Sequence, residues 1–136
     1  MRLALDWIKK MVNFVTAKSQ NEMFDYLKLI VYETDDPLLA WEKERAMDYL
    51  YNGLSFLEKE DFKKAVSYIE SAIDIFEKKN DQLRKSFCFF FMGDVYHQKK
   101  EKETAKDYFK RALEYFEQKK HRMRYACENK LKEMEL

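Results

Sequence analysis

Two stretches of the chain repeat one another and decide the fold: residues 49–72, YLYNGLSFLEKEDFKKAVSYIESA, and residues 89–112, FFFMGDVYHQKKEKETAKDYFKRA. The second begins 40 positions after the first, and the two glycines of the protein occupy the same place in both copies. In each copy the glycine lies between two aromatic residues, and an alanine, a large apolar residue and a second alanine follow. These positions are Tyr49, Gly53, Phe56, Ala65, Ile69 and Ala72 in the first copy, and Phe89, Gly93, Tyr96, Ala105, Phe109 and Ala112 in the second.

This pattern is typical of paired helices that pack closely. The glycine allows the backbone of one helix to approach its partner, and the alanines allow the second helix to close on its own pair and on the next repeat. The bulky residues fill the spaces between the helices. Such a pair cannot bury its apolar faces alone, so we expect the pairs to stack on one another.

The composition of the whole chain agrees with an all-α fold. Its 136 residues are enough for one domain with a single core. Two glycines and one proline are too few for the tight turns of an all-β or α/β fold of this size. A hydrophobic content of 46%, with 16% aromatic residues, is too rich for a disordered chain. We therefore expect a single all-α domain over residues 1–136.

Apolar periodicity and helix-start signals predict about seven helices joined by short turns. Ser19 to Glu22 reads as a capping box, Asp36-Pro37 as a helix start, and Asp61 as a further N-cap. The expected helices cover about residues 3–18, 23–31, 37–59, 62–78, 82–98, 103–118 and 121–136. We expect a diverged helical pair over 1–36, repeats over 37–79 and 80–119, and a C-terminal capping helix over 120–136.

These residues resemble the tetratricopeptide repeat. That family places an aromatic residue, a leucine, a glycine, a tyrosine, an alanine, a phenylalanine and an alanine at this spacing. The second copy is the better match, whereas the first has Asn52 in place of the leucine and Ile69 in place of the phenylalanine. The resemblance covers about residues 46–119, with a repeat length of 40 rather than 34. It implies a right-handed stack of helical hairpins.

In that family the first helix of each repeat lines a concave groove. The resemblance places mainly apolar and aromatic residues there, without the lysine, asparagine and arginine of a chaperone-binding clamp. The candidate partner-binding residues are Leu50, Tyr51, Leu54, Phe87, Phe90, Phe91 and Asp94. Because residues 86–98 are apolar nearly all round, something must cover them. The cover is either another part of this chain or a partner helix or second copy.

The leading hypothesis is therefore a non-enzymatic adaptor that binds another protein, with a homodimer as one possibility. Asp94, His97 and Glu101 share one helix face but form only one incomplete metal array, and no catalytic group, cofactor motif or small-molecule site is found. Cys88 and Cys127 make no disulfide framework. No apolar run is long enough to span a membrane. We expect a cytoplasmic protein without a metal or cofactor.

Two other functions stay open. Residues 38–118 also resemble the region where bacterial response-regulator phosphatases and related peptide-sensing regulators join a helical bundle to their repeats. That family carries more repeats than this chain has room for. The other alternative is RNA binding through a basic cluster, Lys119, Lys120, His121, Arg122 and Arg124. With a net charge of +1 for the whole chain, nucleic acid is the less favoured partner.

Overall fold

The computed structural model describes the backbone of residues 37–135 and the side chains of residues 41–135. This part contains five helices: α3 (Pro37–Glu58), α4 (Phe62–Lys78), α5 (Gln82–Gln98), α6 (Lys102–Gln118) and α7 (Met123–Glu135). The all-α expectation is confirmed, and each helix begins and ends within a few residues of its predicted bounds. The two helices expected over residues 1–36, and the capping box between them, lie outside the described residues.

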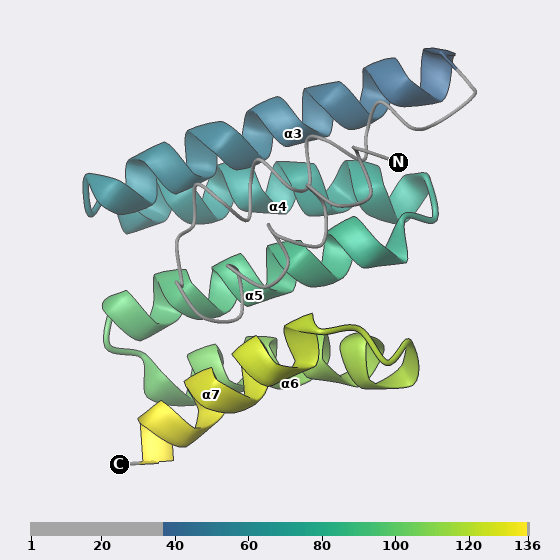
Figure 1. Ribbon diagram of the computed structural model, residues 1–136. Helices are drawn as coiled ribbons and strands as arrows, with labels where there is room; N and C mark the ends of the chain where they lie inside the picture. The colour runs from purple at the N-terminus through teal and green to yellow at the C-terminus, as the bar shows by residue number, and fades with distance from the viewer. Residues whose placement is uncertain (1–36, 136) are drawn as a thin grey trace, which may run out of the picture.

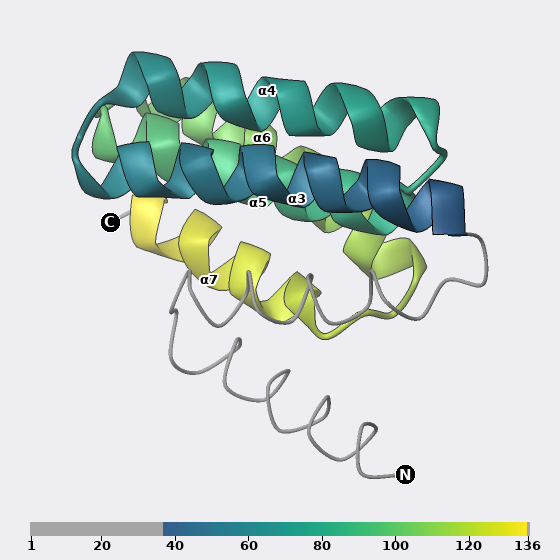
Figure 2. The same ribbon diagram turned by 90° about the horizontal axis from the view of Figure 1, so that it is seen from above.

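The helices form two layers. α3, α5 and α7 lie side by side in one layer, and α4 and α6 lie behind them in the other (Figures 1 and 2). We call the layer of α3, α5 and α7 the inner layer. Contacts are most extensive between α3 and α4 and between α5 and α6, which are therefore two hairpins. α4 also packs on α5, and α7 packs on α6.

The same short turn follows each of the helices α3, α4, α5 and α6. At each turn one residue lies in the left-handed region: Glu60 (φ 59°), Asn80 (φ 55°), Lys100 (φ 66°) and Lys120 (φ 52°). After α3, Asp61 donates its backbone N–H to the Phe56 carbonyl at 2.9 Å, and Glu60 donates to that of Leu57 at 3.0 Å. This pair of bonds is the Schellman motif, and the other three turns have it at equivalent positions.

The residue that closes each turn also begins the next helix. Asp61 accepts a hydrogen bond at Oδ1 from the Lys64 backbone N–H, at 3.3 Å, which confirms the predicted cap. Asp81 does the same for the Arg84 N–H at 3.1 Å. Glu101, the equivalent residue before α6, makes no side-chain cap bond. A single residue thus serves two helices, and the connections need only three residues, or four before α7.

The two glycines mark the closest approach within each hairpin, as the sequence predicts. A β-carbon at Gly53 would lie 2.7 Å from Cγ1 of Ile69 and 3.2 Å from the carbonyl oxygen of Ala65. A β-carbon at Gly93 would lie 2.6 Å from the ring of Phe109. Both distances are shorter than van der Waals contact, so α3 and α5 can meet their partners only without a side chain at these positions.

We expect Gly93→Ala to destabilise the protein by about 1–2 kcal/mol. Overpacking a helix interface costs about 1–3 kcal/mol, and the better helix propensity of alanine offsets up to about 1 kcal/mol of that cost. Urea unfolding followed by circular dichroism measures the change. In a Phe109→Leu background the added methyl group has space, so the same substitution should cost much less there. An equal cost in both backgrounds would contradict the close contact.

Lys100→Gly should raise the free energy of unfolding by about 0.5–1 kcal/mol, because glycine adopts the left-handed conformation without the steric cost that lysine bears. The matched control is Lys99→Gly. Lys99 has φ −72° and is right-handed, so glycine there should destabilise the protein instead. Thermal unfolding of both variants beside the parent chain measures the difference, and the same sign for both would refute the turn assignment.

Candidate interaction surfaces

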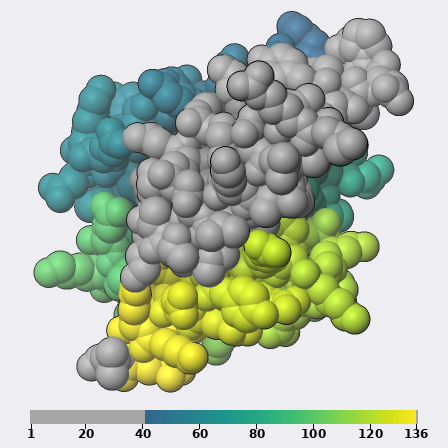
Figure 3. Space-filling view, viewed as in Figure 1, coloured from purple at the N-terminus to yellow at the C-terminus, as the bar shows by residue number. Residues whose placement is uncertain are grey.

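The seven predicted partner-binding residues are on α3 and α5 of the inner layer, but six of them are buried. Leu54 and Asp94 are each 6% exposed, and the other four are 1% exposed or less: Leu50, Phe87, Phe90 and Phe91. Tyr51 is the exception, with 56% of its surface exposed. The space-filling view from the same side shows described side chains of α6 and α7 in the lower part of this face (Figure 3). Of the seven, only Tyr51 is therefore well exposed.

The phenylalanines of α5 pack against the following hairpin. The Phe87 ring meets Phe116 edge to face at 5.2 Å between centroids, and it lies 5.9 Å from the ring of His121. Phe90 contacts Phe109 of α6 in the same way at 5.3 Å. Edge-to-face contacts of buried rings add to the free energy of hydrophobic burial. Phe87 and Phe90 therefore belong to the core that joins α5 to α6 and α7.

Asp94 is engaged by the C-terminal helix. Its Oδ1 lies 3.2 Å from Nζ of Lys130 on α7, and the two side chains are 7% and 19% exposed. Among residues 41–135, no group of three or more His, Cys, Asp or Glu side chains is placed so that it could hold a metal ion. The negative charge of Asp94 also adds to burial in raising the pKa of the Cys127 thiol. The ion pair anchors α7 to α5.

Asp81 is the centre of a second buried polar cluster. The sequence pattern did not predict this cluster. It is 8% exposed. Besides capping α5, its Oδ2 binds the guanidinium of Arg84, and it lies 3.2 Å from Nζ of Lys43 on α3. The equivalence of Asp81 with the cap Asp61, 20 positions earlier, could have indicated the capping role. The partners in space could not be read from the sequence.

An aromatic and cationic cluster recurs in both hairpins. In the first, Phe56 stacks on Tyr68 at 5.4 Å and Tyr49 lies 6.3 Å from the same ring. Three cations lie over these rings: Arg45 over Tyr49 and Lys59 over Phe56, each at 5.7 Å, and Lys64 over Phe56 at 5.2 Å. Cation–π contacts of this kind stabilise partly exposed rings.

The second hairpin repeats this arrangement 40 positions later. Tyr96 stacks on Tyr108 at 5.6 Å and Phe89 lies 6.1 Å from Tyr108. Lys85 lies over Phe89 and Lys99 over Tyr96, at 5.9 and 5.7 Å. The repeat therefore extends to partly exposed residues such as Tyr68 and Tyr108, which the packing motif does not include.

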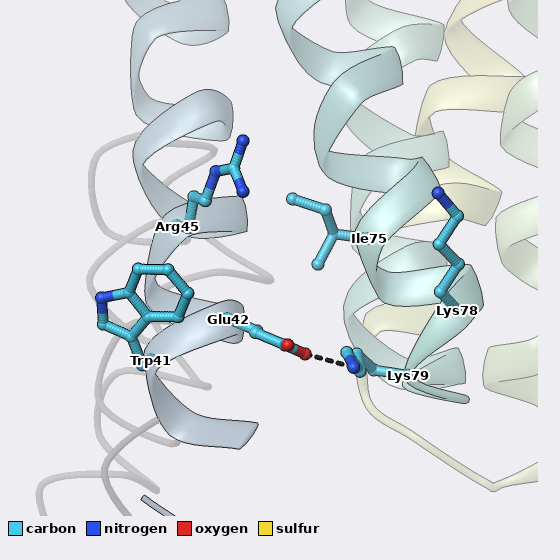
Figure 4. A pocket seen from close by; sticks show the side chains of 6 residues that line it. All are labelled: Trp41, Glu42, Arg45, Ile75, Lys78 and Lys79. Atoms are coloured by element: carbon cyan, nitrogen blue, oxygen red, sulfur yellow. Dashed lines mark ion pairs between the residues drawn. The ribbon is translucent and has the colours of Figure 1, made fainter. Parts of the chain in front are cut away.

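A pocket of about 220 Å³ lies between α3 and α4 (Figure 4). α3 contributes Trp41, Glu42 and Arg45, and α4 contributes Ile75, Lys78 and Lys79. In Figure 4 the carboxylate of Glu42 reaches the Lys79 ammonium across the floor of the pocket. Trp41 is 59% exposed. We call this site the first pocket.

A second pocket, of about 250 Å³, lies between α5 and α6. It is lined by Gln82, Lys85, Ser86, Phe89, Arg111, Glu114, Tyr115 and Gln118. Four of these positions repeat lining positions of the first pocket, 40 residues later: Gln82, Lys85, Tyr115 and Gln118 correspond to Glu42, Arg45, Ile75 and Lys78. The two hairpins therefore have equivalent hollows. The first lies where α3 begins and α4 ends, and the second lies where α5 begins and α6 ends.

The residues of the basic cluster at the α6–α7 turn have different surroundings in the structure. Lys119, Lys120 and Arg122 are exposed, and Arg124 donates a hydrogen bond to the Tyr125 hydroxyl at 2.8 Å. His121 instead lies against Phe87 and Phe116, and its Nδ1 accepts a hydrogen bond from the Met123 N–H at 3.1 Å. Burial lowers the pKa of His121 to about 4. The histidine therefore acts as a neutral cap of α7.

This architecture defines a helical-hairpin repeat protein. The family model for the tetratricopeptide repeat matches residues 45–118, which is more than half of the 136-residue chain and spans both hairpins. The chain belongs to the tetratricopeptide-repeat family. No curated protein and no solved structure gives a significant match. Among the described helices, none is both long enough and apolar enough to cross a membrane.

The buried histidine predicts a loss of stability on acidification. In the unfolded chain His121 takes up a proton near pH 6.5, whereas in the folded protein it does so only near pH 4. The stability that the neutral ring contributes is complete above pH 6.5 and is lost as the pH falls towards 4. His121→Asn keeps a capping oxygen without a titrating ring.

We therefore expect the stability of the His121→Asn variant to fall less than that of the parent chain between pH 6.5 and 4. Urea unfolding at a series of pH values measures this difference. His97→Asn is the matched control, since His97 lies partly exposed near the end of α5, and its profile should follow the parent chain. Parallel profiles for the parent chain and the His121 variant would contradict the prediction.

Proposed function

We propose that this protein is an adaptor that acts by binding another protein rather than by catalysis. The observation that carries the proposal is its membership of the tetratricopeptide-repeat family, whose repeats are generally protein-interaction modules. Two hairpins held by the same glycine and alanine contacts form a rigid stack. Stacked helical repeats offer an extended surface on which a partner segment can lie.

The inner layer is the proposed binding face, with Tyr51 as its contact residue. Tyrosine combines a large apolar ring with a hydroxyl group and is enriched at protein interfaces. Tyr51 is 56% exposed on α3, and Leu50 and Leu54 beside it are buried. In this proposal the buried members of the predicted set, including Phe87, Phe90, Phe91 and Asp94, hold the shape of the face. The partner is a helix or peptide of another protein.

The test is a selection of peptides from a displayed random library against the purified protein, followed by calorimetry of the selected sequences. We expect peptides that bind with micromolar dissociation constants. Tyr51→Ala should weaken them about tenfold or more, as for an interface anchor. Lys110→Ala is the control, because Lys110 is also exposed but lies on α6, in the other layer.

Two results would overturn the proposal. If the selection yields no peptide with a dissociation constant below about 1 mM, the proposed adaptor function is contradicted. If the parent chain and Tyr51→Ala bind the peptides with equal affinity, the inner layer is not the binding site. Light scattering over a range of concentrations separates a partner from a second copy of the chain. If Tyr51 lies in a homodimer interface, its substitution should shift the mass from dimer to monomer.

A further inference from the structure

We propose that the two equivalent pockets form a second binding surface, which takes an acidic segment of a partner protein with one carboxylate and one apolar side chain in each pocket. This surface is separate from the inner face around Tyr51 and goes beyond the function proposed above. The inference rests on three observations: the repetition of the pockets, an arginine in each that lies on an aromatic ring, and the apolar side chains that line each pocket.

Each pocket contains one guanidinium group next to an aromatic ring. In the first pocket, Arg45 lies over Tyr49 and donates a hydrogen bond to its hydroxyl at 3.2 Å. In the second, Arg111 lies 4.4 Å from the centroid of Phe89 and 5.3 Å from that of Tyr108. Stacking restricts the side chain while leaving N–H groups at the edge of the guanidinium plane, which are suited to a carboxylate.

The lysines of the pockets differ from these arginines in already having carboxylate partners. Lys79 binds Glu42, Lys78 lies 3.1 Å from Asp74, and Lys85 lies 2.6 Å from Glu77. No carboxylate among residues 41–135 forms an ion pair with Arg45 or Arg111. The cation available to a ligand in each pocket is therefore an arginine.

Charge and apolar surface together indicate the chemistry of the ligand. In each pocket the lysines are paired with carboxylates, and one arginine is left to bind an acidic group. The apolar lining comes from Trp41 and Ile75 in the first pocket and from Phe89 and Tyr115 in the second. An acidic residue next to an aliphatic or aromatic one satisfies both features.

A protein ligand is favoured over nucleic acid. Nucleic-acid binding requires contacts to a series of phosphates along the backbone. Here carboxylates surround both pockets, namely Glu42, Asp74, Glu77 and Glu114. They would repel a continuous chain of phosphates, whereas a peptide brings a single carboxylate to the arginine of each pocket.

The spacing of the pockets sets a lower limit on the length of the ligand. Neighbouring packed helices lie about 8–10 Å apart. Because α3 and α5 lie side by side in the inner layer, we expect hollows one hairpin apart to be separated by about one such spacing. An extended chain advances about 3.3 Å per residue. A peptide that occupies both pockets must cross the end of α4, and it needs about three residues between its two acidic units.

The probes are fluorescein-labelled peptides with two Asp–Leu units joined directly or by glycine-serine spacers of four or eight residues, and a peptide with one unit. Fluorescence anisotropy measures their affinity for the parent chain. We expect the peptides with four- and eight-residue spacers to bind at least tenfold tighter than the single unit, because the second contact is intramolecular. The directly joined units should give no gain. Replacing aspartate by asparagine in the peptide should abolish the gain.

Arg45→Gln and Arg111→Gln should each reduce the affinity of the eight-residue-spacer peptide to that of the single unit. The matched controls are Lys63→Gln and Lys102→Gln, which remove one charge from exposed residues at the starts of α4 and α6. In each hairpin these residues lie at the end opposite the pocket. These controls should bind as the parent chain does. Circular dichroism confirms that each variant is folded, and the asparagine peptides test the proposal on the unaltered protein.

Equal binding of the aspartate and asparagine peptides, or equal binding by the arginine variants and the lysine controls, would overturn the inference. An oligoribonucleotide that binds more tightly and displaces the peptide would show a nucleic-acid surface instead. The two proposals fail separately. If library-selected peptides depend on Tyr51 but not on Arg45 or Arg111, and no Asp–Leu peptide binds, the adaptor function stands and this surface is refuted.

Discussion

The structure depends on one turn that recurs every 20 residues. After each helix from α3 to α6 the chain passes through a left-handed residue, and the next residue closes the Schellman motif just before the following helix. Because connections of three or four residues leave little freedom for the direction of the chain, the helices must run antiparallel and pack on their neighbours. The stacking of hairpins, the glycine contacts and the repetition of the pockets all follow from this constraint.

The turn also explains why a chain with so little glycine can reverse direction four times. The left-handed positions are occupied by Glu60, Asn80, Lys100 and Lys120, of which only asparagine favours this conformation. Two backbone hydrogen bonds per turn offset the steric cost. The glycines are used instead inside helices, where contact with Ile69 or Phe109 leaves no room for a side chain.

Most of the fold could be predicted from the sequence, but the burial of most candidate binding residues could not. The helix bounds followed from apolar periodicity and from caps such as Asp61, which are local signals. The repeat register placed Gly53 and Gly93 correctly because the same contact occurs twice. The surroundings of Phe87 and Asp94 are different: periodicity shows that a helix is apolar all round, but not that His121 and Lys130 meet it. The stack of Tyr96 on Tyr108 was missed because Tyr108 lies outside the packing motif.

The two buried acidic residues have a consequence for how the stack unfolds. Asp81 connects α3 to α5 through Lys43 and Arg84, and Asp94 connects α5 to α7 through Lys130. Both links cross from one hairpin unit to the next, and breaking either would leave a charge buried without its partner, which is costly. In a repeat protein, interfaces between neighbouring units determine whether they melt one by one or together. These carboxylates therefore bind the units into one cooperative body, so that local opening at one end is transmitted along the array.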